Sequence, residues 1–230
     1  MKKIMETWRN YMNEGESLNT IIFLDMDGVL VDFTSGLVNV LNIDISGDVE
    51  YPRSRGKKLR KIREYHGPDR VFPITNEFMH NLLRKKDEEA ELTQWEKLIK
   101  RYQFSPITGN YEHWLNLPKA DGADMLIQGC VDLVGEQNVY ILSAPVDDAS
   151  IEAKKDWLAK HTSIPLNRTF IRKDKGSIPP LFPNHRCILI DDRVKYKDVF
   201  EQAGGIGIVH SPKATAAGAA NSLASLGNIL

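Results

Sequence analysis

Five short apolar runs recur along the chain and predict the strands of a sheet. Four of them are rich in Ile or Val, and Asp, Ser, Pro or Gly bounds at least one side of each, as is typical of strands buried on both faces. Segments with helical spacing lie between the runs. This alternation predicts an α/β fold, a Rossmann-like parallel sheet with helices on both faces. The runs are Thr20–Leu24, Val139–Leu142, Thr169–Ile171, Cys187–Ile190 and Ile206–Val209.

The interval between the first two runs breaks the alternation. It contains no convincing strand and is too long for a structureless loop in a compact domain. Its apolar residues fall at helical spacing, as at Phe78, Leu82 and Leu83. We therefore expect a helical cap inserted after the first strand. The predicted organisation is an N-terminal helical extension at 1–18, a core at 19–41 and 118–212, a cap at 42–117, and a C-terminal tail or helix at 213–230.

Composition narrows the class of protein. Of the 230 residues 42% are hydrophobic, and 30 basic against 31 acidic side chains give a net charge of −1. No global field therefore attracts nucleic acid or an anionic membrane. Cys130 and Cys187 lie among apolar residues and are predicted to be buried thiols. No run approaches the ~18 apolar residues of a membrane span, and the N-terminus lacks a signal-peptide pattern. We expect a soluble, cytoplasmic protein; its oligomeric state is not visible in the sequence.

Polar side chains gather where the predicted strands end. Asp25 and Asp27 follow the first run, Ser143 closes the second, and Asp191 and Asp192 close the fourth. Ligands of an open parallel sheet bind outside the carboxyl ends of its strands. Three strand ends are thus expected to present several carboxylates and one hydroxyl to a common crevice.

A cluster of carboxylates favours a bound cation, because like charges raise each other's pKa. An all-oxygen site with room for water and phosphate suits Mg²⁺. We expect Asp25 and Asp192 to bind the metal through their carboxylates and Asp27 through its backbone carbonyl. Gly28 would let the backbone turn sharply beside the site.

Simpler interpretations of these residues remain open at this point. The Asp-x-Asp-Gly stretch is compatible with an ordinary turn, and Asp191 and Asp192 with a solvated strand end. A calcium-binding EF-hand is disfavoured, because it would need a ligand at Val29 and a Glu at Gly36. The anion-binding lysine is a choice among Lys154, Lys155, Lys173 and Lys175.

Four segments resemble, in order, the motifs of the haloacid dehalogenase superfamily. Asp25-Met26-Asp27-Gly28-Val29-Leu30 resembles the first motif, Ile141-Leu142-Ser143 the second, and Ile188-Leu189-Ile190-Asp191-Asp192 the fourth. Lys154, three residues before Trp157, resembles the third. The resemblance implies the fold of that superfamily and a magnesium-dependent phosphatase.

The same resemblance implies a role for each residue. Asp25 would attack phosphorus to give an aspartyl-phosphate, and Asp27 would protonate the leaving oxygen and then activate water. Ser143 and Lys154 would hold the phosphoryl oxygens. Asp191 would belong to the metal site, where it would orient a metal-bound water or the lysine.

Within the superfamily the chain is most similar to the 5'(3')-deoxyribonucleotidase family. The similarity lies in Asp25–Phe33, Tyr111–Ala123, Asp174-Lys175 and Leu189–Arg193. It implies a 5'-nucleotidase acting on (deoxy)nucleoside monophosphates, with Phe33 stacking on the base or sugar and Lys175 approaching the phosphate. Ala144 stands where the mammalian-type members carry a second hydroxyl.

Three other functions remain as alternatives. The basic stretch Arg53–Arg70 would suit a polynucleotide backbone and a phosphatase of nucleic-acid ends, although a solvated helix balanced by the acidic run Asp87–Glu91 is the simpler interpretation. A sugar-phosphate phosphatase of the same fold is the second alternative. A binding protein without activity is the third.

Overall fold

The centre of the molecule is a five-stranded parallel sheet. The computed structural model describes residues 19–47, 53–85, 92–211 and 215–230. The strands lie in the order β3-β2-β1-β4-β5, and every neighbouring pair is parallel. All five predicted strands are confirmed, and with them the α/β fold. Their bounds are Asn19–Leu24 (β1), Val139–Ser143 (β2), Thr169–Ile171 (β3), His185–Asp191 (β4) and Ile206–Val209 (β5).

Strand β1 lies in the middle of the sheet and is buried on both faces. Ile22 and Leu24 belong to one hydrophobic cluster, and Ile21 and Phe23 to another, as the two-residue period of a strand requires. At the carboxyl end, Leu24 pairs with Ile141 of β2 and with Ile190 of β4. The residues that follow these three strands therefore meet at one edge of the sheet.

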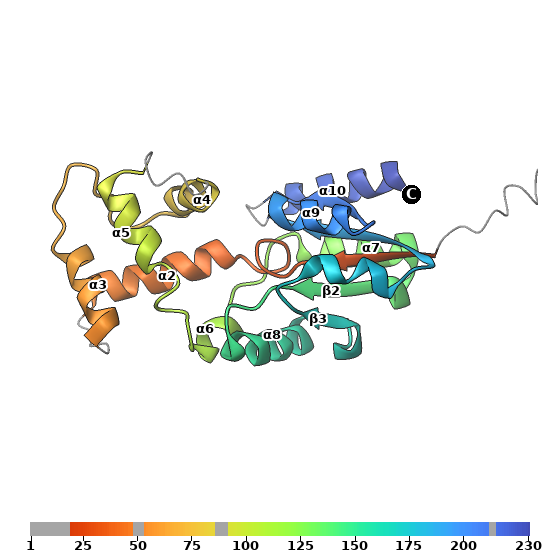
Figure 1. Ribbon diagram of the computed structural model, residues 1–230, viewed down its shortest axis with the longest axis horizontal. Helices are drawn as coiled ribbons and strands as arrows, with labels where there is room; N and C mark the ends of the chain where they lie inside the picture. The colour runs from red at the N-terminus through yellow and green to blue at the C-terminus, as the bar shows by residue number, and fades with distance from the viewer. Residues whose placement is uncertain (1–18, 48–52, 86–91, 212–214) are drawn as a thin grey trace, which may run out of the picture.

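Helices cover both faces of the sheet (Figure 1). The cluster that contains Ile22 and Leu24 also includes side chains of α7, α8 and α10. The opposite cluster includes Phe200 of α9 and Ile178 beside the short helices η4 and η5. The bounds are Ala123–Val134 (α7), Asp148–His161 (α8), Val194–Gln202 (α9), Ala216–Ile229 (α10), Glu136–Asn138 (η2), Leu166–Arg168 (η3), Lys175–Ser177 (η4) and Pro179–Leu181 (η5).

The insertion between β1 and β2 is helical where it is described. Its elements are α2 (Phe33–Ser46), α3 (Arg53–Arg63), α4 (Asn76–Arg84), α5 (Gln94–Tyr102) and α6 (Tyr111–Leu115). Helix α2 runs outward from the sheet to α3, α4 and α5 (Figure 1). The predicted cap boundary at residue 42 falls inside α2, because the buried stripe of Leu37, Leu41 and Ile45 continues across it. Helix α6, predicted as cap, packs against α8 of the core.

The remaining predictions concern the ends of the chain and its buried residues. The extension predicted at 1–18 lies outside the described residues. Most of the segment from residue 213 is helix α10, which packs against α7 with Leu226 buried. Cys130 and Cys187 are buried free thiols. Over the described ranges, no helix has both the length and the apolar character that a membrane span requires.

The basic stretch forms α3 and the loop after it. Arg63 is partly buried and donates hydrogen bonds to the backbone carbonyls of Asp44 and Gly47, while Arg60 pairs with Glu64 at the surface. The acidic run predicted to balance it lies outside the described residues. Part of this basic charge therefore ties α3 to the end of α2.

Candidate active site

The loop after β1 forms the floor of the site. The Asp25 amide donates to the carbonyl of Ile190, which continues the sheet by one residue, and a tight turn follows. Gly28 in that turn has φ +78°, a conformation that favours glycine. A Cβ at Gly28 would lie 2.7 Å from Oδ2 of Asp192. Glycine is therefore required here both for the turn and for the close approach of Asp192.

Three carboxylates meet at this edge of the sheet. Asp25, Asp191 and Asp192 each place a carboxylate oxygen within 4.8 Å of the others. Burial, with a contribution from Asp25, raises the pKa of Asp191 to about 7 and the pKa of Asp192 well above its usual value. A cation among these oxygens would relieve the repulsion between them. The cluster consists of hard oxygen donors and fits a divalent ion such as Mg²⁺.

Lys175 neutralises part of this cluster from below. Its ammonium nitrogen lies 2.8 Å from Oδ1 of Asp25 and 2.5 Å from Oδ2 of Asp191. Burial opposes the charge on Lys175, but the two carboxylates raise the pKa of its ammonium above the usual value. The second oxygen of Asp191 accepts a hydrogen bond from the Arg193 amide. Both oxygens of Asp191 are thus engaged within the protein.

Lys154 contacts Asp27, the other aspartate of the loop. Its ammonium nitrogen lies 2.7 Å from Oδ2 of Asp27, 3.0 Å from Oγ of Ser143 and 2.9 Å from the Ala144 carbonyl. These three contacts use all the donors of the ammonium group. Burial raises the pKa of the Asp27 carboxyl and Asp25 adds to the effect, while Lys154 opposes it. Each aspartate of the loop therefore has its own buried lysine.

The lysine of α8 is fixed by the start of its helix. The Asp147 side chain accepts a hydrogen bond from the Ser150 amide, and the Ser150 hydroxyl lies 3.0 Å from the Asp147 amide, a reciprocal capping box. Lys154 follows one turn later and is fully buried. The local sequence thus sets the direction from which the ammonium reaches Asp27.

A cleft of about 470 Å³ opens above the floor, between the sheet edge and the inserted helices. Of the site residues predicted from sequence, Ser143, Lys154, Lys175 and Asp191 are fully buried and do not line it. The cleft is lined by Asp25, Asp27, Gly28, Phe33, Thr34, His80, Leu83, Phe104, Trp114, Ala144, Pro145, Val146, Asp192, Arg193, Val194, Lys195 and Tyr196.

Aromatic and apolar residues form one wall of the cleft. Phe33 stacks on Trp114 with ring centroids 5.8 Å apart and planes 18° apart. Trp114 is held by a hydrogen bond from its Nε1 to the Ile107 carbonyl. Thr34 and His80 meet across α2 and α4 at 3.4 Å. His80, Leu83 and Phe104 belong to no sequence motif, and Arg193 stands only at the end of one.

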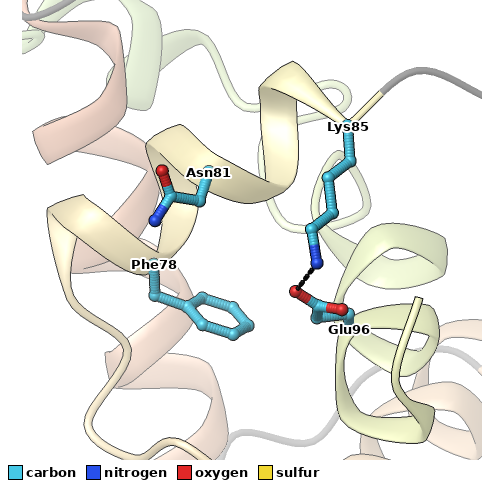
Figure 2. A pocket seen from close by; sticks show the side chains of 4 residues that line it. All are labelled: Phe78, Asn81, Lys85 and Glu96. Atoms are coloured by element: carbon cyan, nitrogen blue, oxygen red, sulfur yellow. Dashed lines mark hydrogen bonds and ion pairs between the residues drawn. The ribbon is translucent and has the colours of Figure 1, made fainter. Parts of the chain in front are cut away.

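A second hollow lies within the inserted helices. It measures about 410 Å³ and is lined by Phe78, Asn81, Lys85 and Glu96. An ion pair of 2.7 Å joins Lys85 of the α4 end to Glu96 of α5 (Figure 2). Glu96 also completes the capping box of α5, so its carboxylate is committed to the fold. The carboxylates and lysines of the sheet edge make the first cleft the candidate active site.

Comparison with known proteins gives only distant similarities. No family model and no curated protein matches the sequence. The chain is similar to the structure of a haloacid dehalogenase-like hydrolase from Burkholderia xenovorans (16% identity, 83% of this chain and 81% of that one, TM-score 0.45). It is also similar to a HAD hydrolase of family IA, variant 3, from Entamoeba histolytica (14% identity, 84% of each chain, TM-score 0.46). At such identities the reaction has to be inferred from the site itself.

Proposed function

We propose that the protein is a magnesium-dependent phosphomonoester hydrolase of the haloacid dehalogenase superfamily, acting through an aspartyl-phosphate on Asp25. The observation that carries the proposal is the pairing of two neighbouring aspartates with two different buried lysines. Asp25 contacts Lys175, and Asp27 contacts Lys154. Two carboxylates held in different environments suit two different roles, a nucleophile and an acid–base group.

The donor set fits Mg²⁺. The carboxylates of Asp25 and Asp192, with the backbone carbonyl of Asp27, would hold the ion. Asp191 was expected as a metal residue, but both of its oxygens already accept hydrogen bonds, one from Lys175 and one from the Arg193 amide. We assign Asp191 to the positioning of Lys175. When bound, Mg²⁺ neutralises charge on the phosphoryl oxygens.

The proposed reaction has two halves. In the first, an Asp25 carboxylate oxygen attacks phosphorus, the bond to the ester oxygen breaks, and Asp27 gives that oxygen a proton. In the second, water attacks phosphorus, Asp27 takes the water's proton, and the bond to Asp25 breaks to release phosphate. Lys175 keeps Asp25 aligned for the attack. Lys154 contacts Asp27, and Ser143 contacts Lys154. Both are fully buried, so we assign them to the positioning of Asp27.

A nucleoside monophosphate is the substrate that we propose. The cleft volume of about 470 Å³ is in the range of small-molecule sites. Phe33 is half-buried and already packed on Trp114 on one side, which leaves part of its ring for a base or sugar. Stacking on a rigid ring contributes binding free energy with little loss of conformational entropy.

Phosphate release from a panel of monoesters tests the proposal. The panel contains ribo- and deoxyribonucleoside monophosphates and sugar phosphates, with Mg²⁺ or with EDTA. We expect metal-dependent release from nucleotides that falls on the order of 10³-fold or more in Asp25→Asn. Asp198→Asn, on the exposed side of α9, is the matched control and should keep full activity.

The outcomes separate the parts of the proposal. Release from sugar phosphates alone would keep the phosphatase and reject the nucleotidase. Full activity of Asp25→Asn would reject the aspartyl-phosphate. Absence of release from every monoester would reject the hydrolase.

A further inference from the structure

Two cations on one side of the cleft have no role in the reaction described above. Arg193 directly precedes α9 and Lys195 lies in the first turn of that helix, and both line the cleft with exposed side chains. In the part of the chain that the structure describes, neither forms an ion pair with a carboxylate. Lys197, two residues further along, pairs with Glu201 at 2.5 Å. Of these three cations, the two without an ion pair are thus the two that line the cleft.

These two cations converge on one ring. The guanidinium carbon of Arg193 lies 5.5 Å, and the ammonium of Lys195 5.8 Å, from the ring centroid of Tyr196, which also lines the cleft. Lys175 approaches the same ring at 4.7 Å. Three positive charges near one ring repel each other. Lys175 is ion-paired with two carboxylates, whereas Arg193 lowers the pKa of Asp192 through its charge without forming an ion pair with it. An anion in the cleft would relieve this repulsion.

The charges at the floor of the site are balanced without Arg193 and Lys195. Three of the four aspartates there contact the two buried lysines, and the divalent ion of the proposed function would balance the remaining charge. The phosphorus under attack must come within about 3–3.5 Å of Asp25, which is only 3% exposed at the bottom of the cleft. Arg193 and Lys195 are exposed, so they suit a group held further out.

Among the described residues, the other walls of the cleft carry no lysine or arginine, and their polar side chains Thr34 and His80 contact each other at 3.4 Å. Pro145 and Val146 after β2, and Leu83 and Phe104 of the insertion, are apolar. A substrate with its phosphate at Asp25 and its organic part on this side would turn its remaining polar groups towards Arg193. An arginine can hold a phosphate through two parallel hydrogen bonds, and a lysine adds a compact charge.

We propose that Arg193 and Lys195 form a subsite for a second phosphate of the substrate, so that the preferred substrate is a small phosphate monoester whose alcohol part carries another phosphate. The proposal rests on the phosphatase function proposed above and narrows its substrate class. A nucleoside 3',5'-bisphosphate has this chemistry. The phosphodiester of a 5'-phosphorylated dinucleotide shares it, and the test separates the two.

The test compares kcat/KM for three substrates built on the same nucleoside: the 5'-monophosphate, the 3',5'-bisphosphate and the 5'-phosphorylated dinucleotide. The enzymes are the wild type, Arg193→Gln, Lys195→Gln and the double variant. Lys197→Gln is the matched control. Because Arg193 and Lys195 are exposed, we expect their variants to fold like the wild type, and thermal unfolding checks this for every variant.

We expect the kcat/KM of the wild type to be about 10-fold or more higher for the bisphosphate than for the monophosphate. The kcat/KM for the dinucleotide should be close to that for the monophosphate. Each variant should lower kcat/KM for the bisphosphate about 10-fold, mainly through KM, and leave the monophosphate nearly unchanged. The preference should weaken with added salt. Equal losses on both monoesters would overturn the subsite and place the cations on the attacked phosphate. A kcat/KM for the dinucleotide as high as that for the bisphosphate would overturn the restriction to small substrates.

A binding measurement keeps this test separate from the proposed function. Calorimetric titration of Asp25→Asn with the bisphosphate and the monophosphate requires no turnover. Tighter binding of the bisphosphate, lost when Arg193→Gln is added, would support the subsite even if the wild type released no phosphate. Equal binding of the two ligands would reject it whatever the activity.

Discussion

The ammonium nitrogen of Lys154 lies 2.7 Å from Oδ2 of Asp27, while Asp25, two residues earlier, pairs with Lys175. Lys154 and Asp27 are 127 positions apart in the chain. The contact joins the middle of α8 to the loop after β1. It gives the proposed acid–base group a partner separate from that of the proposed nucleophile.

Replacement of Lys154 is expected to affect substrates according to their leaving groups. In Lys154→Met, Asp27 loses the contact that orients it towards the leaving oxygen. We expect kcat/KM to fall about 10²-fold for an alkyl phosphate, which needs a proton on its leaving oxygen, and less than about 10-fold for p-nitrophenyl phosphate. Steady-state kinetics on the two substrates measures the difference. Lys155→Met, a more exposed neighbour paired with Glu152, should change neither; equal losses in Lys154→Met would place Lys154 on the nucleophile instead.

Removal of one carboxylate from the acidic cluster is expected to make the free energy of unfolding less dependent on Mg²⁺. Burial, with repulsion from Asp25 and Asp191, raises the pKa of Asp192. Asp192→Asn removes this buried charge, so without metal at about pH 8 the variant should be more stable than the wild type by about 1 kcal/mol. Mg²⁺ at 100 times its Kd should stabilise the wild type by about 2.7 kcal/mol and the variant much less. Urea unfolding with and without Mg²⁺ measures both. Equal stabilisation of both proteins by Mg²⁺ would exclude Asp192 as a ligand.

His113 in α6 makes the fold sensitive to acid. Burial lowers the pKa of its imidazole from 6.5 to about 4, and its Nε2 has no hydrogen-bond partner among the described residues. Between pH 6.5 and 4 the unfolded chain binds more protons at this residue than the folded chain, so stability falls as the pH falls through that window. We expect His113 to account for about 2 kcal/mol of that loss.

The matched variant for this effect is His113→Gln. The free energy of unfolding of the wild type minus that of the variant, followed by urea denaturation from pH 7.5 to 4, isolates the histidine from the carboxylates. A difference that shrinks towards acid pH fits the buried neutral imidazole. A difference that stays constant across the range would contradict it.

The sheet could be predicted from sequence because its strands are compact apolar runs with clear boundaries. Leu24 and Ile190 end two adjacent strands, so the aspartates that follow them were bound to meet once the sheet was parallel. The position of Gly28 beside Asp192 follows from the same alignment. Local pattern and sheet topology were sufficient for this part of the site.

The pairing of each lysine with its own aspartate could not be predicted in the same way. Lys154 comes from a helix interior and Lys175 from a short 3₁₀ turn, and their aspartate partners depend on the three-dimensional packing. The predicted start of the insertion, residue 42, lies inside α2, because apolar spacing does not show where one continuous helix leaves the core. The cleft residues of the insertion, such as His80 and Phe104, carry no local motif.

The central claim is that Asp25 becomes phosphorylated, and rapid acid quenching followed by peptide mass spectrometry tests it most directly. The protein is mixed with substrate and Mg²⁺, quenched within its first turnover, and compared with Asp25→Asn and Asp27→Asn. We expect a phosphoryl group on the peptide that contains Asp25, more of it in Asp27→Asn with a good leaving group, because hydrolysis is then slowed, and none in Asp25→Asn. Turnover with no phosphorylated Asp25 at any quench time in wild type or Asp27→Asn, or a phosphoryl group on another residue, would contradict the account.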